Sequence, residues 1–168
     1  MMNLMNNAVI NIPKPVNEPI LSYEPGSPEK AAIKEALAEM SSRQLEIPLI
    51  IGGKEIRTGN LGKVVMPHDH NHVLATYHKA GPEEVQQAID TAVAAQPIWQ
   101  SFRWEERCAI FLKAAELIAV KYRALLNSGA MLAGGKNVYQ AEIDAACELI
   151  DFLRYNVSYA QEIYQKQP

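Results

Sequence analysis

The chain has 168 residues, which is enough for one domain with a substantial core and too few for two large ones. Hydrophobic residues make up 48% of the chain and charged residues 21%, values typical of globular proteins. The formal net charge is -3, and the lysines and arginines are scattered among acids, so we expect no nucleic-acid partner.

The sequence also argues against a membrane partner. The longest apolar segment, residues 108–120, is interrupted by Lys113 and Glu116, which favours a core helix over a membrane span. The first 15 residues have neither the basic region nor the sustained apolar stretch of a signal peptide, so we predict a cytoplasmic protein. In that reducing compartment, Cys108 and Cys147 are expected to be buried free thiols.

Residues 1–46 are predicted to form an extended arm followed by a short helix. Residues 1–27 show no periodicity and contain prolines that would break a helix or a central strand: Pro13, Pro15, Pro19 and Pro25. The Ser27-Pro28-Glu29 segment then supplies an N-cap, a proline at the first helical position and an early acid. This signal predicts a helix that runs to about Arg43.

Residues 47–80 are predicted to hold the strands. The segment IPLIIGGKEIRTG has a β-rich run, a Gly-Gly turn and an alternating group, which predicts a hairpin. Two further extended runs, residues 63–66 and 73–78, flank a turn at residues 67–72. We expect the first of these runs to pack beside the hairpin.

Residues 82–165 are predicted to form four mainly antiparallel helices, so the whole chain has an α+β fold. The apolar spacing has the 3.6-residue period of helices that bury one face. The expected helices cover residues 82–97 (ended by Pro97), 104–118, 122–132 and 138–164.

The Gly134-Gly135-Lys136 segment has two interpretations, a phosphate-binding loop or the end of a helix. A phosphate loop needs a glycine where this chain has Ala130 and a serine or threonine where it has Asn137. No strand precedes the glycines either. We therefore predict a left-handed glycine C-cap.

The segment MPHDHNH is the richest in potential metal ligands. His68, His70 and His72 alternate and would share one face of a strand, as zinc or nickel ligands can. The intervening Asp69 and Asn71 equally favour a polar turn. We favour the turn and predict no metal site.

Neither cysteine is predicted to be a nucleophile. Catalytic thiols usually lie in a loop or at a helix N-terminus, where the thiolate is stabilised, whereas Cys108 and Cys147 fall within helical patterns. On an ideal helix, Cys147 projects opposite the apolar stripe of the last helix. It is therefore expected to pack against another element or to face solvent.

The last predicted helix carries four acids near an apolar stripe. Asp144 and Asp151 fall outside the stripe and are expected to be solvated. Glu142 lies within the stripe and Glu148 at its border, so each carboxylate must be paired, at a pocket or at an interface. The polar residue Asn156 also falls within the stripe. The apolar residues that form the stripe are Val138, Ala145, Leu149, Phe152, Ala160 and Ile163.

Four segments carry a resemblance to a known family. They are GGKEIRTG, VMPHDHNHVL, AIFLKAAELI and AGGKNVYQAEIDAACELIDFLRYN. In this order they resemble the N-terminal part of the delta-1-pyrroline-5-carboxylate dehydrogenases, a branch of the aldehyde dehydrogenase superfamily. The resemblance covers residues 48–168.

The resemblance implies NAD-dependent oxidation of L-glutamate gamma-semialdehyde to L-glutamate in proline degradation. It also implies that residues 47–168 are an incomplete NAD-binding domain and that the full-length enzyme is a homo-oligomer. In the family, the catalytic cysteine, the general-base glutamate, the oxyanion-hole asparagine and most of the dinucleotide-binding units come after the position matching Pro168. No catalytic or cofactor-binding residue is therefore assigned in this chain, and alone it is expected to be inactive.

One family residue has a counterpart here. The glutamate that lines the substrate entrance, near the substrate amino group, matches Glu148, whose position at the border of the stripe agrees with a pocket. Glu142 receives no role from the resemblance. The alternative to an enzyme is a non-catalytic helical module for binding or oligomerisation.

Overall fold

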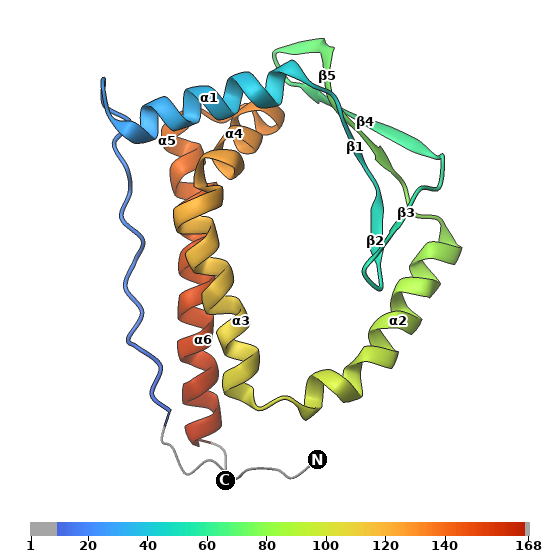
Figure 1. Ribbon diagram of the computed structural model, residues 1–168, viewed down its shortest axis with the longest axis vertical. Coiled ribbons are helices and arrows are strands. Elements are labelled where there is room, and N and C mark those ends of the chain that lie inside the picture. Colours follow the sequence, from blue (N-terminus) through green and yellow to red (C-terminus); the bar gives the residue numbers. More distant parts are fainter. Residues whose placement is uncertain (1–9, 167–168) are drawn as a thin grey trace.

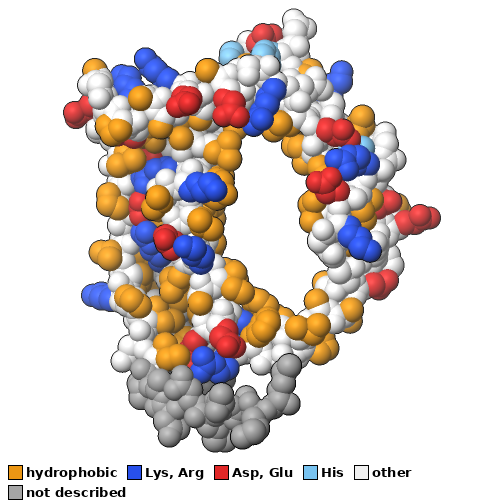
Figure 2. Space-filling model, in the orientation of Figure 1, with side chains coloured by type: hydrophobic (Ala, Val, Ile, Leu, Met, Phe, Trp, Pro, Cys, Tyr) orange, Lys and Arg blue, Asp and Glu red, His pale blue; other side chains and the backbone are white. Residues whose placement is uncertain are grey.

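The computed structural model describes residues 10–166, whose elements form an open frame (Figure 1). Long helices make one side of the frame, the strands and α2 make the other, and α1 joins the two sides at one end. An opening passes between the two sides in the space-filling view (Figure 2). The order of elements confirms the predicted α+β fold.

The N-terminal segment is extended, as predicted, over residues 10–27, and it runs beside α6 (Figure 1). The predicted arm before residue 10 lies outside the described residues. Helix α1 (Pro28–Ser42) begins at Ser27, whose Oγ accepts a hydrogen bond from the backbone N–H of Lys30 at 3.3 Å. The predicted end of this helix is correct to within one residue.

The strands form two separate sheets. The larger has the order β1 (Leu45–Ile47), β5 (Asp69–His78), β4 (Leu61–Met66), with β1 parallel and β4 antiparallel to β5. The smaller is the predicted hairpin of β2 (Leu49–Ile51) and β3 (Lys54–Ile56). Gly52 and Gly53 make its turn with φ of 59° and 75°, which other residues rarely adopt.

The partner of one strand differs from the neighbour that we expected. Residues 63–66 were expected to pack beside the hairpin, whereas β4, which contains them, pairs with β5. The turn between them is shorter than predicted, since it consists of Pro67 and His68 alone and strand β5 already begins at Asp69. A two-residue turn returns the chain directly onto the preceding strand.

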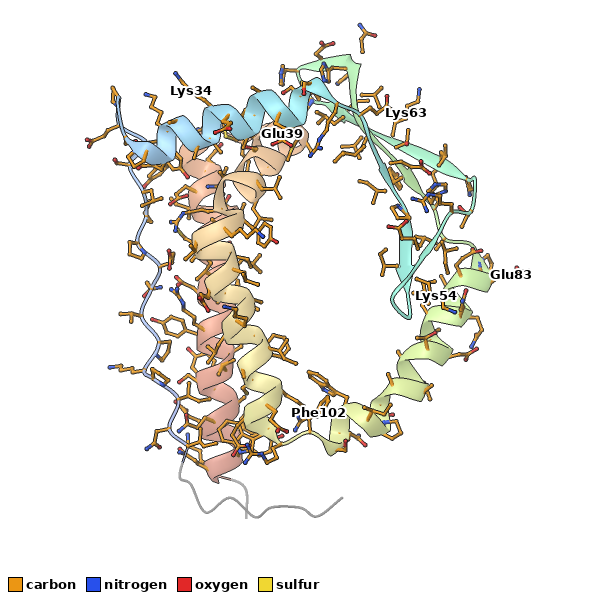
Figure 3. The ribbon with its side chains drawn as sticks, in the orientation of Figure 1. Lys34, Glu39, Lys54, Lys63, Glu83 and Phe102 are labelled. Atoms are coloured by element: carbon orange, nitrogen blue, oxygen red, sulfur yellow. The ribbon has the colours of Figure 1, made fainter. Side chains whose placement is uncertain are left out.

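Helix α2 (Pro82–Ser101) does not end at Pro97 as predicted. A proline removes one backbone hydrogen bond, and near the end of a long helix that loss leaves the preceding turns intact. The helix continues until the N–H of Phe102 bonds to the carbonyl of Trp99 at 3.3 Å. The rings of Trp99 and Phe102 pack edge to face. Phe102 lies at the link to the next helix (Figure 3).

The remaining helices form an antiparallel pair, with α3 against α6 (Figure 1). The second and third predicted helices are joined without a loop, because a π turn, η1, connects them. A second π turn, η2, interrupts the last predicted helix. The elements are α3 (Trp104–Leu117), η1 (Ile118–Tyr122), α4 (Arg123–Gly134), α5 (Val138–Ala141), η2 (Glu142–Cys147) and α6 (Glu148–Lys166).

The core lies where α1, α4 and the larger sheet meet, around Met66, Leu74 and Leu132. By contrast, α2 contributes no buried residue, and the structure describes the whole of this helix. On α6, the exposed part of the predicted stripe includes Leu149, Phe152 and Ile163. Side chains from both sides of the frame project into the opening (Figure 3).

Between residues 10 and 166, no helix combines the length and the apolar character needed to cross a bilayer.

Candidate functional site

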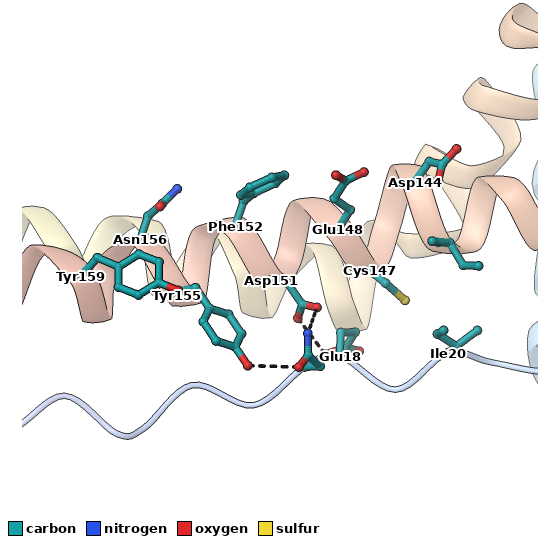
Figure 4. A pocket seen from close by; sticks show the side chains of 12 residues that line it. Glu18, Ile20, Asp144, Cys147, Glu148, Asp151, Phe152, Tyr155, Asn156 and Tyr159 are labelled. Atoms are coloured by element: carbon teal, nitrogen blue, oxygen red, sulfur yellow. Dashed lines mark hydrogen bonds between the residues drawn. The ribbon is translucent and has the colours of Figure 1, made fainter.

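A groove of about 790 Å³ lies between the extended N-terminal segment and the last helix (Figure 4). Asn17, Glu18 and Ile20 form its wall on the N-terminal side. The other wall is formed by η2 and α6, and it includes the aromatic residues Phe152, Tyr155 and Tyr159. The groove therefore combines carboxylates with apolar and aromatic surface, as ligand sites commonly do.

Glu148 lies in this groove, at the first residue of α6. Phe152 and Asn156 follow at intervals of four residues, so the three side chains lie in one row along the helix (Figure 4). Glu148 and Phe152 are exposed. An exposed carboxylate beside an aromatic ring is suited to bind a cationic amino group.

A smaller cavity of about 220 Å³ continues from this row toward α3. It shares Phe152 and Asn156 with the groove, and Cys108 and Phe111 of α3 line its other side. Its lining is mainly apolar. The row thus lies between the groove, whose lining includes carboxylates, and a cavity lined mainly by apolar side chains.

Behind the groove, Glu142 is completely buried in a cluster of hydrogen-bond donors. Its carboxylate accepts bonds at 2.8 Å from the backbone N–H of Leu21, the hydroxyl of Tyr23 and Nδ2 of Asn127. Arg123 completes the cluster, with Nε 3.2 Å from both carboxylate oxygens and Nη2 also bonded to Oε1. The expectation that Glu142 must be paired is confirmed.

The cluster keeps both of its charges. Burial alone would raise the pKa of Glu142, but the bonds from Arg123, Leu21 and Tyr23 lower it below the usual value. Burial would likewise lower the pKa of Arg123, and its bonds to Glu142 and Glu18 raise it. Burial and the bond to Glu142 raise the pKa of Tyr23 to about 12, so its hydroxyl remains a donor.

The two π turns explain why a uniform helical wheel misplaces this cluster. In an α-helix, residues five apart project roughly 140° from each other, whereas one turn of π-helix brings them to the same side. Turn η2 spans Glu142 and Cys147, whose Oε1 and Sγ atoms are 3.7 Å apart. Glu142 is therefore buried while Leu149, which was assigned to the same stripe, is exposed.

Asp151 was expected to be solvated, but it is half-buried and bonded to the N-terminal segment. Its carboxylate accepts bonds at 2.7 Å from the backbone N–H of Glu18 and from Nδ2 of Asn17 (Figure 4). The sequence pattern of one helix could not show that an extended segment lies on this face. Asp144 is exposed, as predicted, and forms an ion pair with Lys136 at 2.8 Å.

Among the other sequence candidates, Gly135 and His72 have structural roles. Gly135 is left-handed with φ of 68°, and its N–H bonds to the carbonyl of Met131 at 3.1 Å, so the predicted C-cap is confirmed. His68 and His70 are exposed, whereas Nε2 of His72 bonds to the carbonyl of Ser41 at 3.1 Å. No group of three or more possible metal ligands gathers within residues 10–166.

Both cysteines are free and buried. Cys147 packs against another element, the first of the two expected alternatives, because its Sγ lies 3.3 Å from Nη2 of Arg123 and 3.8 Å from the carbonyl of Pro19. Burial, followed by the charge of Glu142, raises the pKa of Cys147 to about 11. Burial also raises the pKa of Cys108.

Sequence reasoning missed Arg123, Asn127, Glu18 and Tyr23. A signal existed for the first two, because Arg123 and Asn127 are four residues apart and share one face of a largely apolar helix. A buried Glu142 carboxylate needs hydrogen-bond donors on a facing element. The side chains of Arg123 and Asn127 both carry N–H donors. Nothing comparable singled out Glu18 or Tyr23 within the proline-rich segment.

The fold is that of a known class of enzymes. Residues 56–168 match the aldehyde dehydrogenase family, and the chain belongs to this family. Its curated relatives include the delta-1-pyrroline-5-carboxylate dehydrogenases of Agaricus bisporus, 52% identical over 96% of this chain, and Dictyostelium discoideum, 51% identical over 94% of it. The latter is named as mitochondrial.

A solved structure agrees with these relatives. The delta-pyrroline-5-carboxylate dehydrogenase of Mycobacterium tuberculosis, solved with NAD bound, superposes on 97% of this chain with a TM-score of 0.94 and 39% identity. This chain covers 31% of that structure, and it spans 30% of the Agaricus relative and 28% of the Dictyostelium relative. The remaining parts of those proteins have no counterpart in the residues described.

Proposed function

We propose that this chain is the N-terminal portion of an NAD-dependent dehydrogenase that oxidises L-glutamate gamma-semialdehyde to L-glutamate in proline degradation. The proposal rests on the match of 96% of the chain, at 52% identity, to a delta-1-pyrroline-5-carboxylate dehydrogenase. The shared fold of a relative solved with NAD supports the cofactor. In this reaction the aldehyde carbon gains an oxygen from water and loses a hydride to NAD.

In this proposal, residues 47–168 begin the NAD-binding domain and residues 1–46 form a separate arm and helix. The Gly134–Lys136 segment does not fit a phosphate cradle, because Gly135 is a helix C-cap and the Lys136 ammonium is bonded to Asp144. We therefore assign NAD binding and the catalytic cysteine to parts of the enzyme beyond these residues.

Within this chain, Glu148 is the residue to which we assign contact with substrate. Its carboxylate is exposed in the groove, and it would attract the cationic amino group of the semialdehyde. That attraction acts equally in the ground state and in the transition state, so it strengthens binding without speeding the chemical step. Its loss should therefore raise KM and leave kcat nearly unchanged.

The activity is tested by supplying the complete enzyme with NAD and glutamate semialdehyde and following NADH by absorbance. We expect the complete enzyme to form NADH and the isolated 168-residue chain to form none, since no thiol here is placed to attack an aldehyde. An inactive complete enzyme, or NADH formation by the isolated chain, would contradict the proposal.

Glu148→Gln in the complete enzyme tests the assigned residue. We expect KM for the semialdehyde to rise by about fivefold, an effect typical of one partly solvated charge contact. The same aldehyde without its amino group serves as the control substrate, and its KM should not change. An equal loss with both substrates would mean that Glu148 has only a structural role.

We further propose a cytoplasmic homo-oligomer, in which the exposed apolar residues of α2 and α6 become covered. Light scattering of the complete enzyme and cell fractionation test these two points. The same exposed surfaces favour one alternative, a non-catalytic helical module for binding or oligomerisation. That alternative makes two predictions. The isolated chain should form a stable assembly, and the complete protein should lack dehydrogenase activity.

A further inference from the structure

The extended segment of residues 10–27, here called the arm, is held to the helices along most of its length. Near one end, the backbone N–H of Ile12 donates to Oε1 of Gln161 at 3.1 Å. Near the other, the N–H of Leu21 donates to buried Glu142 at 2.8 Å. Side chains of η2 and α6 thus satisfy backbone groups of the arm, as a neighbouring strand would in a sheet.

Glu18 is the central connection between the arm and the helices. Its side chain is only 10% exposed, and its two carboxylate oxygens bond to different helices. Oε1 lies 2.5 Å from Nη1 of Arg123 on α4, and Oε2 lies 2.6 Å from Nη1 of Arg154 on α6. Its backbone N–H donates to Asp151 at 2.7 Å, so a single residue fixes the arm at three points.

These contacts lie directly beside the Glu148 row. Asp151 and Tyr155 each hold Asn17, through bonds of 2.7 Å and 3.0 Å, and both also line the groove (Figure 4). Asp151 follows Glu148 by three residues, so the two lie on adjacent turns of one helix. The width of the groove therefore depends on how closely the arm approaches α6.

We propose that Glu18 is a positioning residue for substrate binding, which fixes the arm as the second wall of the groove opposite Glu148. This inference rests on the proposed function, because it takes the groove as the substrate entrance. A neutral side chain cannot replace Glu18, since two guanidinium groups face its carboxylate in a largely dry site. Arg154 has a side chain that is 29% exposed. Without the charge of Glu18, we expect it to turn to water and the arm to be held less closely to the helix.

Glu18→Gln in the complete enzyme is the test, with Glu24→Gln as the matched control. Glu24 is also an arm glutamate, but it is exposed. Hydrogen exchange measured by mass spectrometry reports on the arm itself. We expect Glu18→Gln to speed exchange at the amides of Glu18 and Leu21 on the order of tenfold, because their acceptors lie on the helices that the arm leaves.

Steady-state kinetics give the functional readout. We expect Glu18→Gln to raise KM for the semialdehyde on the order of threefold with kcat retained, since the reacting groups are untouched. The double variant Glu18→Gln/Glu148→Gln should raise KM by less than the product of the factors for the two single variants, because both changes act through one groove. Glu24→Gln should change neither exchange nor KM.

The outcomes separate this inference from the proposed function. If Glu148→Gln raises KM but Glu18→Gln changes only stability, the positioning role is wrong and the substrate assignment stands. If Glu18→Gln leaves exchange in the arm at the wild-type rate, the positioning role is also wrong. If Glu148→Gln leaves KM unchanged, the substrate assignment fails and the positioning role fails with it.

Discussion

Arg123 and Glu142 form an ion pair at the place where the two π turns of the structure meet. Arg123 directly follows η1, Glu142 is the first residue of η2, and the two turns are in contact. The carboxylate is completely buried and also accepts bonds from Leu21 and Tyr23 of the arm. One ion pair therefore joins the arm to both long helices that run behind the groove.

Glu142→Gln should destabilise the protein more than any change at the exposed acids. The amide cannot balance the charge of buried Arg123, and breaking one partner of a buried pair costs about 3 kcal/mol. Urea unfolding followed by circular dichroism measures this cost. Asp144→Asn is the control, since its ion pair with Lys136 is exposed and is worth less than about 1 kcal/mol.

The same ion pair predicts a loss of stability in acid. The pKa of Glu142 is lower in the folded than in the unfolded protein, so its stabilising effect is present above the usual value of 4.5. That effect is lost as the pH falls from 4.5 through the lower folded pKa. The free energy of unfolding of the wild type should therefore decline steeply below this pH.

Glu142→Gln provides the comparison, because glutamine does not titrate. Its free energy of unfolding should decline less than that of the wild type over the same acidic range. Urea titrations at a series of pH values measure both curves. Parallel curves for the two proteins would show that other carboxylates, and not Glu142, govern the acid transition.

Most secondary structure was predictable because local signals agreed with the final fold. Ser27 and Pro28 begin α1, Gly52-Gly53 makes the hairpin turn and Gly135 ends α4, all through conformations that these residues favour. The end of α2 was not predictable from Pro97, because the helix needed only one more turn to reach its terminal contact between Trp99 and Phe102.

The candidate site was only partly predictable. A single carboxylate in an apolar stripe correctly indicated that Glu142 is paired, since burial of a lone charge is too costly. The identity of its partners depends on η1, η2 and the path of the arm, and none of these has a periodic signal. The misplacement of Asp151 has the same cause, because its donors come from residues more than 130 positions away along the chain.

The histidine turn should be structural and should bind no metal. Nε2 of His72 already bonds to the carbonyl of Ser41, while His68, in the turn between β4 and β5, and His70, near the start of β5, are exposed. Elemental analysis of dialysed protein measures bound zinc and nickel, and we expect substoichiometric amounts of both. Stoichiometric zinc that is retained by the wild type and lost in His70→Ala would overturn the prediction.

Both cysteines should be unreactive in the folded protein. Cys147 has its pKa raised to about 11, so at pH 8 only on the order of 0.1% of this thiol is the reactive thiolate. Cys108 is also buried, and burial raises its pKa. Iodoacetamide at pH 8 should therefore modify neither residue within the time that labels free cysteine.

Mass spectrometry locates the modified residues, and the same reaction in urea is the control, in which both cysteines should react. Glu142→Gln supplies a second comparison. The carboxylate of Glu142 opposes ionisation of Cys147, and its removal leaves Arg123, whose charge lowers the pKa of this thiol. Labelling of Cys147 should therefore be faster in Glu142→Gln than in the wild type. Labelling of Cys108 should become faster only because the less stable variant unfolds more often. Rapid labelling of Cys147 in the folded wild type would contradict its burial against Arg123 and the arm.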